Sequence, residues 1–461
     1  MREKLKALQA DAKEAAEFLR ERLEAGKSVK IISHVDADGI AAAAILAKCL
    51  QYYNAPYVLK FCKPMRGGEI EMLGSESYEV YIFVDQGTVQ LEDIHKHLLA
   101  RGRDVLIVDH HGGELKTHSN LRYVHPHKVG MNGGKDVSAS GVAYMLAESI
   151  STKFRSLVKL ALVGAIGDRQ EFADGFEGIN SIFAKMAEDS GLIGVEEGLG
   201  LAGRSIRSVL FSLWTSTRPY LPGLSGDIDE SRKFLENLDI DYSISISEMS
   251  SDEQKELSDA ILKKIGGDER VRNMLWKRIY VDRQKELLGT YELQEFACLL
   301  DCCADMNAAE VGFALAMGDG RAVEKAINLF EMRQKELLRI VQQIMRRMND
   351  FKEMKNFRYI HVPDAGPTMI GEAMSVLIES GIIKADKPVL GVSVAGENEL
   401  KVSARGTQEL AKRGYDLGKA IRRAAAETGE SGGGHDVAAS ARIRREKLEE
   451  FLKRLDAYLG V

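Results

Sequence analysis

The chain has 461 residues, of which 45% are hydrophobic and 29% are charged, and its formal net charge is −6 at pH 7. This length exceeds what one hydrophobic core usually supports, so we expect two or three domains. No apolar run approaches the roughly 20 residues that span a bilayer, and the negative charge excludes a simple polybasic binder, so any nucleic-acid contact must use local basic patches.

The first third of the chain alternates helical patterns with short β-type runs. Three apolar runs are typical of buried parallel strands: Val29–Ser33, Val80–Val84 and Val105–Val108. Helical patterns lie before, between and after them, at residues 1–26, 40–50, 91–101, 139–151 and 154–166. This alternation predicts an α/β fold with a doubly wound parallel sheet.

Each predicted strand is followed by acids or histidines. The three continuations are His34-Val35-Asp36-Ala37-Asp38-Gly39, Asp85-Gln86-Gly87-Thr88 and Asp109-His110-His111-Gly112-Gly113. Right-handed crossovers would bring all three to one edge of the sheet, where open α/β sheets bind ligands. A further acid, Asp168, follows the apolar helix at 154–166. A role as a helix cap or turn residue explains any one of these acids about as well, but it does not explain why they gather at one predicted edge.

Six of these side chains are candidate ligands of divalent metal ions: His34, Asp36, Asp38, Asp85, His110 and Asp168. In an extended strand end, the first three would share one face at steps of roughly 7 Å, which suits two adjacent ions. Carboxylates with two imidazoles favour Mn²⁺, with Mg²⁺ or Co²⁺ tolerated, over thiolate-bound zinc. Two ions roughly 3.5–4 Å apart would hold a bridging hydroxide and stabilise both the attacking and the leaving oxygen of a phosphoryl transfer.

The rest of the chain carries fewer motifs. Residues 170–320 have a mainly helical pattern, and an uninterrupted helical pattern follows at 321–351. The five cysteines show no paired framework, which predicts free thiols in a reducing, cytoplasmic compartment. We therefore predict a catalytic domain, a mainly helical insert, a connecting helix and a C-terminal nucleic-acid-binding domain, at residues 1–195, 196–320, 321–356 and 357–461.

The C-terminal domain is predicted to be a smaller α/β unit. Its strand candidates are Tyr359–Val362, Val389–Val394 and Leu400–Ala404, and its helix candidates are 369–381, 415–427 and 446–459. The segment Gly432-Gly433-Gly434-His435 lies between the last two helices. Glycine amides can cradle an anion, and His435 and Arg405 would then clamp a phosphate. A flexible turn is the alternative explanation of the glycine triplet.

Taken together, the motifs resemble the DHH phosphoesterase superfamily, specifically the RecJ-like exonucleases, and most closely their archaeal, replication-associated branch. Residues His34 to Gly39, then Asp85, then Asp109-His110-His111, then Asp168 match the family motifs in order. The family's C-terminal domain is matched by residues 402–407 and 432–439. The resemblance covers roughly 28–170 and 357–445, together with the long helix.

The resemblance implies a role for each matched residue. Asp85 would bridge two ions, His34 and Asp36 would complete one site, and Asp38, His110 and Asp168 would complete the other. His111 would face the scissile phosphate, and Asp109 would orient the histidines from behind. His125 and His127 resemble a Pro-His loop of the family, and they would either support the ligands or contact substrate.

The leading hypothesis is a metal-dependent single-strand exonuclease of DNA replication or repair. RecJ-like enzymes suggest 5′→3′ degradation of DNA, with RNA also possible. One alternative is a phosphodiesterase of short oligonucleotides or cyclic dinucleotides. The other is a scaffold of the replicative helicase assembly, a part that degenerate RecJ relatives play in eukaryotes. The middle region would then dock a partner such as the GINS complex.

Overall fold

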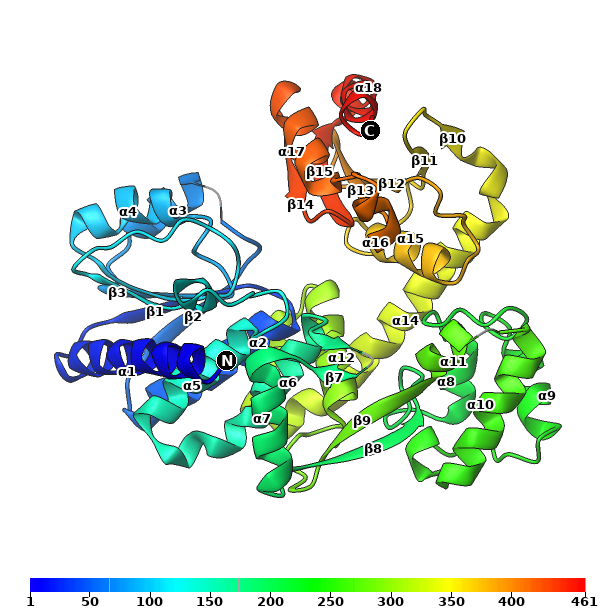
Figure 1. Cartoon of the computed structure of the whole chain (residues 1–461), viewed down its shortest axis with the longest axis horizontal. Coiled ribbons are helices and arrows are strands. Elements are labelled where there is room, and N and C mark those ends of the chain that lie inside the picture. The colour runs from blue at the N-terminus through cyan, green and yellow to red at the C-terminus, as the bar shows by residue number, and fades with distance from the viewer. Residues whose placement is uncertain (66, 173, 268, 461) are drawn as a thin grey trace. The chain divides into compact units, whose positions relative to one another are not determined.

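The computed structural model describes residues 1–65, 67–172, 174–267 and 269–460. The chain forms two compact units, each assembled from three segments, and each unit contains a central β-sheet (Figure 1). Unit 1 comprises residues 1–206, 246–255 and 276–331, and unit 2 comprises residues 207–245, 256–275 and 332–461. Residues 196–320, predicted as one insert, therefore contribute to both units.

The main sheet of unit 1 has five strands, all parallel, in the order β2-β1-β3-β4-β5. This confirms the predicted doubly wound parallel sheet. The strands are β1 (Val29–Ser33), β2 (Tyr57–Phe61), β3 (Val80–Val84), β4 (Asp104–Val108) and β5 (Leu121–Val124). Because the chain adds β2 on one side of β1 and β3 on the other, the order reverses between β1 and β3, which is where such sheets bind ligands.

Helices cover both faces of this sheet. Two short helices, α3 (Gly67–Gly74) and α4 (Leu91–His97), pack on one face through Ile70, Leu73 and Ile94. On the opposite side lie α1 and α5, with α2 packed against α5 and α6 (Figure 1). The bounds of these helices are α1 (Arg2–Glu24), α2 (Ala37–Tyr52), α5 (Ala139–Ile150) and α6 (Val158–Gly167).

The region predicted as mainly helical also contains an antiparallel ribbon in unit 1. Strand β8 (Ile193–Leu199) pairs along its whole length with β9 (Trp276–Asp282), and two short strands, β6 (Glu171–Phe172) and β7 (Gly175–Phe176), form a hairpin. The helical prediction is therefore wrong for these residues. Strand β8 pairs with a strand far along the chain, and β6 and β7 have only two residues each, too few to show a periodicity. The helices of the region are α7 (Gly178–Asp189), α8 (Val209–Trp214), α9 (Ile228–Glu236), α10 (Ser251–Ile265), α11 (Glu269–Leu275), α12 (Leu293–Asp305) and α13 (Ala309–Met317).

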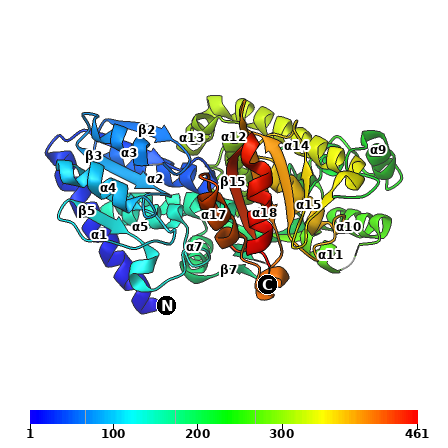
Figure 2. The same ribbon diagram turned by 90° about the horizontal axis from the view of Figure 1, so that it is seen from above.

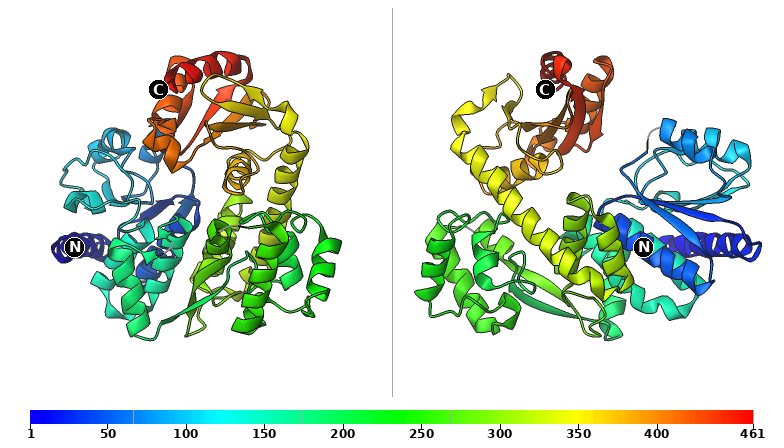
Figure 3. Two further views of the ribbon diagram at one scale, coloured as in Figure 1. Left: turned by 45° about the vertical axis from the view of Figure 1, so that its right-hand side comes forward. Right: turned by 180° about the vertical axis from the view of Figure 1, so that it is seen from behind.

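The long helix predicted at 321–351 is present as α14 (Val323–Arg346), which runs as one helix in the right-hand view of Figure 3, but it ends earlier than predicted. Its 24 residues contain neither proline nor glycine. No described helix is both long and apolar enough to cross a membrane. The five cysteines are free thiols, as predicted.

Unit 2 contains a mixed six-stranded sheet in the order β10-β11-β12-β13-β15-β14. Helices α17 and α18 lie side by side over one face (Figure 2), where Leu400, Val402 and Ala404 join their core. Helix α15 packs against β12 and β13. The bounds are β10 (Lys352–Glu353), β11 (Arg358–His361), β12 (Val389–Val394), β13 (Glu399–Arg405), β14 (Ser431–Gly434), β15 (Ala438–Arg444), α15 (Ile370–Glu379), α16 (Gln408–Lys412), α17 (Leu417–Glu427) and α18 (Leu448–Tyr458).

Candidate metal centre

The candidate ligands begin where the central strands of unit 1 end. His34 and Asp85 follow β1 and β3 directly, and both continue the hydrogen bonding of the sheet. The N–H of His34 donates to the carbonyl of Val84 at 3.1 Å, and the N–H of Asp85 donates to the carbonyl of Val108 at 2.9 Å. The sheet itself therefore fixes the backbone of both residues.

The first motif is not extended, contrary to our expectation. Helix α2 already begins at Ala37, so Asp36 is its N-cap residue and Asp38 lies in its first turn. The Asp36 carboxylate accepts the N–H of Gly39 at 3.0 Å, and Asp301 of α12 accepts the N–H of Ala37 at 2.9 Å. The helix starts this early because acceptors are present for N–H groups that its first turn leaves free.

The carboxylate of Asp38 points at the N-terminus of another helix. Its two oxygens accept the N–H groups of Ala139 and Ser140 in α5, at 2.7 and 2.9 Å. Burial and the neighbouring Asp85 raise the pKa of Asp38 to about 7. The two amides therefore position Asp38 at the N-terminus of α5.

The six predicted ligands meet in two groups. One group is His34, Asp36 and Asp85, the other is Asp38, His110 and Asp168, and in each the ligand atoms lie within 4.8 Å of one another. Asp85 faces both groups, since its Oδ2 is 3.3 Å from His34 Nδ1 and its Oδ1 is 3.2 Å from His110 Nε2. This is the arrangement expected of a carboxylate that bridges two ions.

Three atoms of these groups are buried without a hydrogen-bond partner in the described parts of the chain: His34 Nδ1, Asp85 Oδ1 and His110 Nε2. Unsatisfied polar atoms in a protein interior are costly and rare. All three face the cluster of carboxylates, and divalent cations placed there would satisfy them. The residues present therefore fit a pair of divalent ions.

Asp109 organises the two histidines that follow it. It is fully buried, and its Oδ1 accepts the N–H groups of His110 and His111 at 2.8 and 3.1 Å and lies 2.9 Å from His111 Nδ1. Its Oδ2 accepts the N–H of Thr88 at 3.0 Å. Burial alone would raise the pKa of Asp109, but the hydrogen bond from His111 holds it below its usual value. The His111 side chain remains 41% exposed, and it is oriented by Asp109.

His125 and His127 belong to neither ligand group. His125 is fully buried, its Nε2 lies 3.1 Å from the carbonyl of His111, and its Nδ1 accepts the N–H of His127. Burial lowers the pKa of His125 to about 4, so the ring is neutral at physiological pH. Of the two roles considered, these contacts support the one in which His125 holds the loop of His111.

Three residues near the ligands were not identified from the sequence: Gly133, Gln170 and Asp301. Gly133 accepts a hydrogen bond from the His110 ring, Gln170 donates to Asp168, and Asp301 accepts from Ala37. Only Gly133 gave a signal, because Asn132-Gly133-Gly134 is typical of a turn. Gln170 and Asp301 belong to no sequence motif that would have identified them.

The substrate-binding residues predicted for the C-terminal domain lie in unit 2. Arg405, at the end of β13, lines a cavity of about 360 Å³ together with Arg270, Ser375 and Thr407. Its Nε donates to Ser375 Oγ at 3.1 Å, and its Nη1 donates to the carbonyl of Ala404 at 2.9 Å. His435 is exposed in the turn between β14 and β15.

The glycine triplet is a strand, which corrects its expected place in a loop between helices. Gly432, Gly433 and Gly434 belong to β14 and pair with β15. Helix α17 packs so closely on this strand that a Cβ at Gly432 would lie 2.9 Å from Ile421, and a Cβ on Gly418 would lie 2.2 Å from the carbonyl of Gly434. Close approach of α17 therefore accounts for part of the glycine content.

Two family models match the chain. The DHH family N-terminal domain matches residues 28–166, and the DHHA1 domain matches residues 359–460. An uncharacterized protein of Methanocaldococcus jannaschii is 28% identical over 466 residues, covering 100% of this chain and 99% of that protein. The single-stranded-DNA-specific exonuclease RecJ of Bacillus subtilis is 25% identical over 206 residues, which are 42% of this chain and 26% of that protein. The chain thus spans about a quarter of this RecJ.

Solved structures share the fold across nearly the whole chain. RecJ of Thermus thermophilus in complex with Mn²⁺ has a TM-score of 0.60 at 18% identity, covering 98% of this chain and 55% of that one. CDC45 of Entamoeba histolytica has a TM-score of 0.69 at 13% identity, covering 98% and 99%. Identities this low demonstrate a common fold alone.

Proposed function

This chain belongs to the DHH superfamily as a RecJ-like protein, and from that membership we propose that it is a metal-dependent exonuclease of single-stranded nucleic acid. The observation that carries the proposal is the position of Asp85, whose two oxygens face two separate groups of ligands. A single structural ion would need only one such group. Two groups with a shared carboxylate suit the in-line displacement at a phosphodiester.

We propose that two divalent cations, preferably Mn²⁺ and alternatively Mg²⁺ or Co²⁺, occupy these groups. When bound, such a pair activates water and stabilises charge on the attacking and leaving oxygens. His34, Asp36 and Asp85 would hold one ion, and Asp38, His110 and Asp168, with Asp85, the other. The RecJ structures of Thermus thermophilus with Mn²⁺ and with Mg²⁺ support this choice.

His111 is the proposed contact to the scissile phosphate. Its ring is held by Asp109 through Nδ1, which leaves Nε2 free to donate toward substrate from a partly exposed position. Burial disfavours the charged ring, but the hydrogen bond and charge of Asp109 raise its pKa above the usual value. A donor of this kind stabilises charge on a phosphoryl oxygen.

Unit 2 is proposed to hold the nucleic-acid strand. Arg405 offers a guanidinium to a phosphate, and His435 offers an exposed ring next to the glycine strand Gly432 to Gly434. Strand β15 pairs with the strands of both Arg405 and the glycines. We propose degradation of DNA in the 5′→3′ direction, with RNA as a further substrate, in replication or repair. GINS is the proposed partner, through the middle region.

The experiment follows the degradation of long single-stranded DNA and RNA, each labelled in turn at either end, with Mn²⁺. Asp85→Asn keeps the shape of the side chain and suits the left-handed backbone at this residue, whose φ is +55°. We expect the wild type to release mononucleotides and the variant to be slower by more than about 100-fold.

The matched control is Asp104→Asn. Asp104 is as buried as Asp85 but lies at the opposite end of the parallel strands, where it pairs with Arg22 and Lys27. It should lower stability and leave the activity of the folded protein unchanged. Consumption of dinucleotides alone would instead favour the short-substrate phosphodiesterase, and inactivity with every metal would favour the scaffold.

A further inference from the structure

A buried glutamine connects two members of one ligand group. Gln170 follows α6 and is fully buried. Its Nε2 donates to Asp168 Oδ2 at 2.6 Å and to the carbonyl of Gly133 at 2.8 Å. Both hydrogens of one amide group are therefore used, one on a candidate ligand and one on a loop.

The carbonyl of Gly133 links Gln170 to His110, because it contacts both side chains. It lies 2.7 Å from His110 Nδ1, and because a carbonyl only accepts, Nδ1 must carry the proton. In the neutral ring the lone pair is therefore on His110 Nε2, which faces Asp38, Asp85 and Asp168. Gly133 approaches so closely that a Cβ there would lie 1.8 Å from the carbonyl of His110. This loop sets the tautomer that metal ligation requires.

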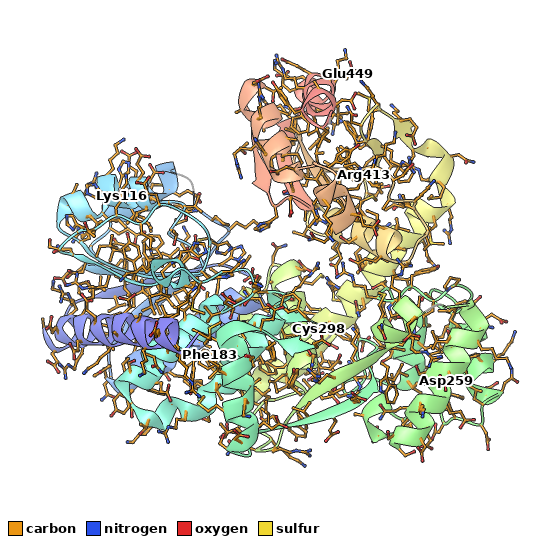
Figure 4. All side chains as sticks on the ribbon, in the orientation of Figure 1. Lys116, Phe183, Asp259, Cys298, Arg413 and Glu449 are labelled. Carbon is orange, nitrogen blue, oxygen red and sulfur yellow. The ribbon has the colours of Figure 1, made fainter. Side chains whose placement is uncertain are left out.

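A second buried amide fixes the orientation of the first. Asn180 of α7 is fully buried, and its Nδ2 donates to Gln170 Oε1 at 2.7 Å. This donor forces the oxygen of Gln170 toward Asn180 and its nitrogen toward Asp168 and Gly133. One turn further along α7, Phe183 (labelled in Figure 4) packs edge to face on Tyr144 of α5, with ring centroids 5.1 Å apart. That contact anchors α7 to the helix whose N-terminus binds Asp38.

From these contacts we infer that Gln170 is a positioning residue for the second ion, the one at Asp38, His110 and Asp168. Gln170 holds His110 and Asp168 together, and Asn180 orients Gln170. The inference rests on the proposed two-ion site. Within the described residues, the side-chain amide groups of Gln170 and Asn180 donate to Asp168, to Gly133 and to each other, and not to His34, Asp36 or Asp85. Substitution of Gln170 should therefore weaken the binding of the second ion and leave the binding of the first ion unchanged.

The test is Gln170→Glu, a variant of nearly equal shape. A carboxylate there would oppose Asp168 and the carbonyl of Gly133 with acceptors in place of donors. Mn²⁺ is titrated into the full chain and followed by calorimetry and electron paramagnetic resonance. We expect the wild type to bind two Mn²⁺ with a spin-coupled spectrum. The variant should bind one Mn²⁺ normally and the second about 10–100-fold more weakly, without spin coupling.

Two further comparisons separate positioning from general destabilisation. Gln254→Ala removes another buried glutamine of unit 1, which accepts from Leu199 and Arg204, and should lower stability while leaving both Mn²⁺ in place. Asn180→Ala should lower the affinity for the second Mn²⁺. The double variant Asn180→Ala/Gln170→Ala should bind this ion as weakly as Gln170→Ala alone, because Asn180 acts through Gln170.

Two Mn²⁺ bound with wild-type affinity and spin coupling in Gln170→Glu would overturn the inference and leave the proposed function standing. Additive effects of Asn180→Ala and Gln170→Ala would likewise refute the coupling between them. A wild-type protein that binds no Mn²⁺ would overturn the proposed function, and this inference with it.

Discussion

Asp85 is the residue on which the candidate centre depends. It has a left-handed backbone with φ of +55°, which aspartate tolerates better than most residues. Burial would raise its pKa, but the positive charges of the neighbouring His110 and His34 rings hold that pKa below its usual value, whereas the pKa of Asp38 is raised. An unusual backbone at a buried charged residue is typical of functional sites. Its identity was predictable from the motif, and its backbone conformation was not.

A buried acid of unit 1 outside the centre gives a prediction about pH. Glu295 of α12 is 5% exposed and lies beside Glu292, and burial raises its pKa from 4.5 to about 8. Between these values the unfolded chain releases the proton and the folded chain keeps it, so the free energy of unfolding falls as pH rises from 4.5 to about 8. Each pH unit in this window costs at most about 1.4 kcal/mol.

Glu295→Gln cannot ionise, so it should match the wild type near pH 4.5 and exceed it in melting temperature by a margin that grows toward pH 8. Thermal unfolding at several pH values measures this margin. Glu310→Gln, at an exposed carboxylate of α13, serves as control and should show no growing margin. A constant difference between Glu295→Gln and the wild type would contradict the assigned pKa.

At the scale of elements, the success of prediction followed burial and the distance between strand partners. Strands β1, β3 and β4 are buried at every residue and consist mostly of apolar residues, so they were found. Strand β2 is an edge strand with no fully buried residue, and β5 is an edge strand of only four residues. Both edge strands were missed because β2 is partly exposed and β5 is short, so neither has a clear pattern of apolar residues.

The packing of three helices around Asp38 yields a second prediction. A Cβ on Gly164 of α6 would lie 2.1 Å from Ser140 Oγ and 2.3 Å from Asp38 Oδ1. Gly164→Ala should therefore push α6 away from α5, displace Asp38 from its amides, lower stability by about 1–3 kcal/mol and weaken Mn²⁺ binding. Thermal unfolding and Mn²⁺ titration measure the two effects.

The control for Gly164 is another helical glycine. A Cβ on Gly68 of α3 would meet no atom within 4 Å, so Gly68→Ala should raise stability by up to about 1 kcal/mol through helix propensity. If Gly164→Ala also raised stability and left Mn²⁺ binding intact, the close packing around Asp38 would be refuted.

At the scale of the whole molecule, the chain passes repeatedly between its two units. Residues 207–245 and 256–275 belong with the C-terminal part, although they lie between segments of unit 1. Sequence patterns describe neighbours along the chain, so they could not reveal which distant segments fold together. The candidate ligands were predictable because all six lie within one contiguous segment of unit 1, before residue 206.

This division predicts that metal ions stabilise one unit before the other. All candidate ligands lie in unit 1, and an ion that binds only the folded state adds about 2.7 kcal/mol when its concentration is 100 times its dissociation constant. The chain has two tryptophans, Trp276 in unit 1 and Trp214 in unit 2. The variants Trp214→Phe and Trp276→Phe therefore report the unfolding of one unit each.

We expect Mn²⁺ to raise the unfolding midpoint reported by Trp276 by several degrees and to raise the midpoint reported by Trp214 less. Asp85→Asn in the Trp214→Phe background should abolish the shift, because it removes the carboxylate common to both ligand groups. Equal shifts from both reporters would mean that the units unfold as one, and no shift from Trp276 would refute the metal centre. Unequal shifts would place the ions in unit 1, where the switch point between β1 and β3 gathers ligands from strand ends far apart in sequence.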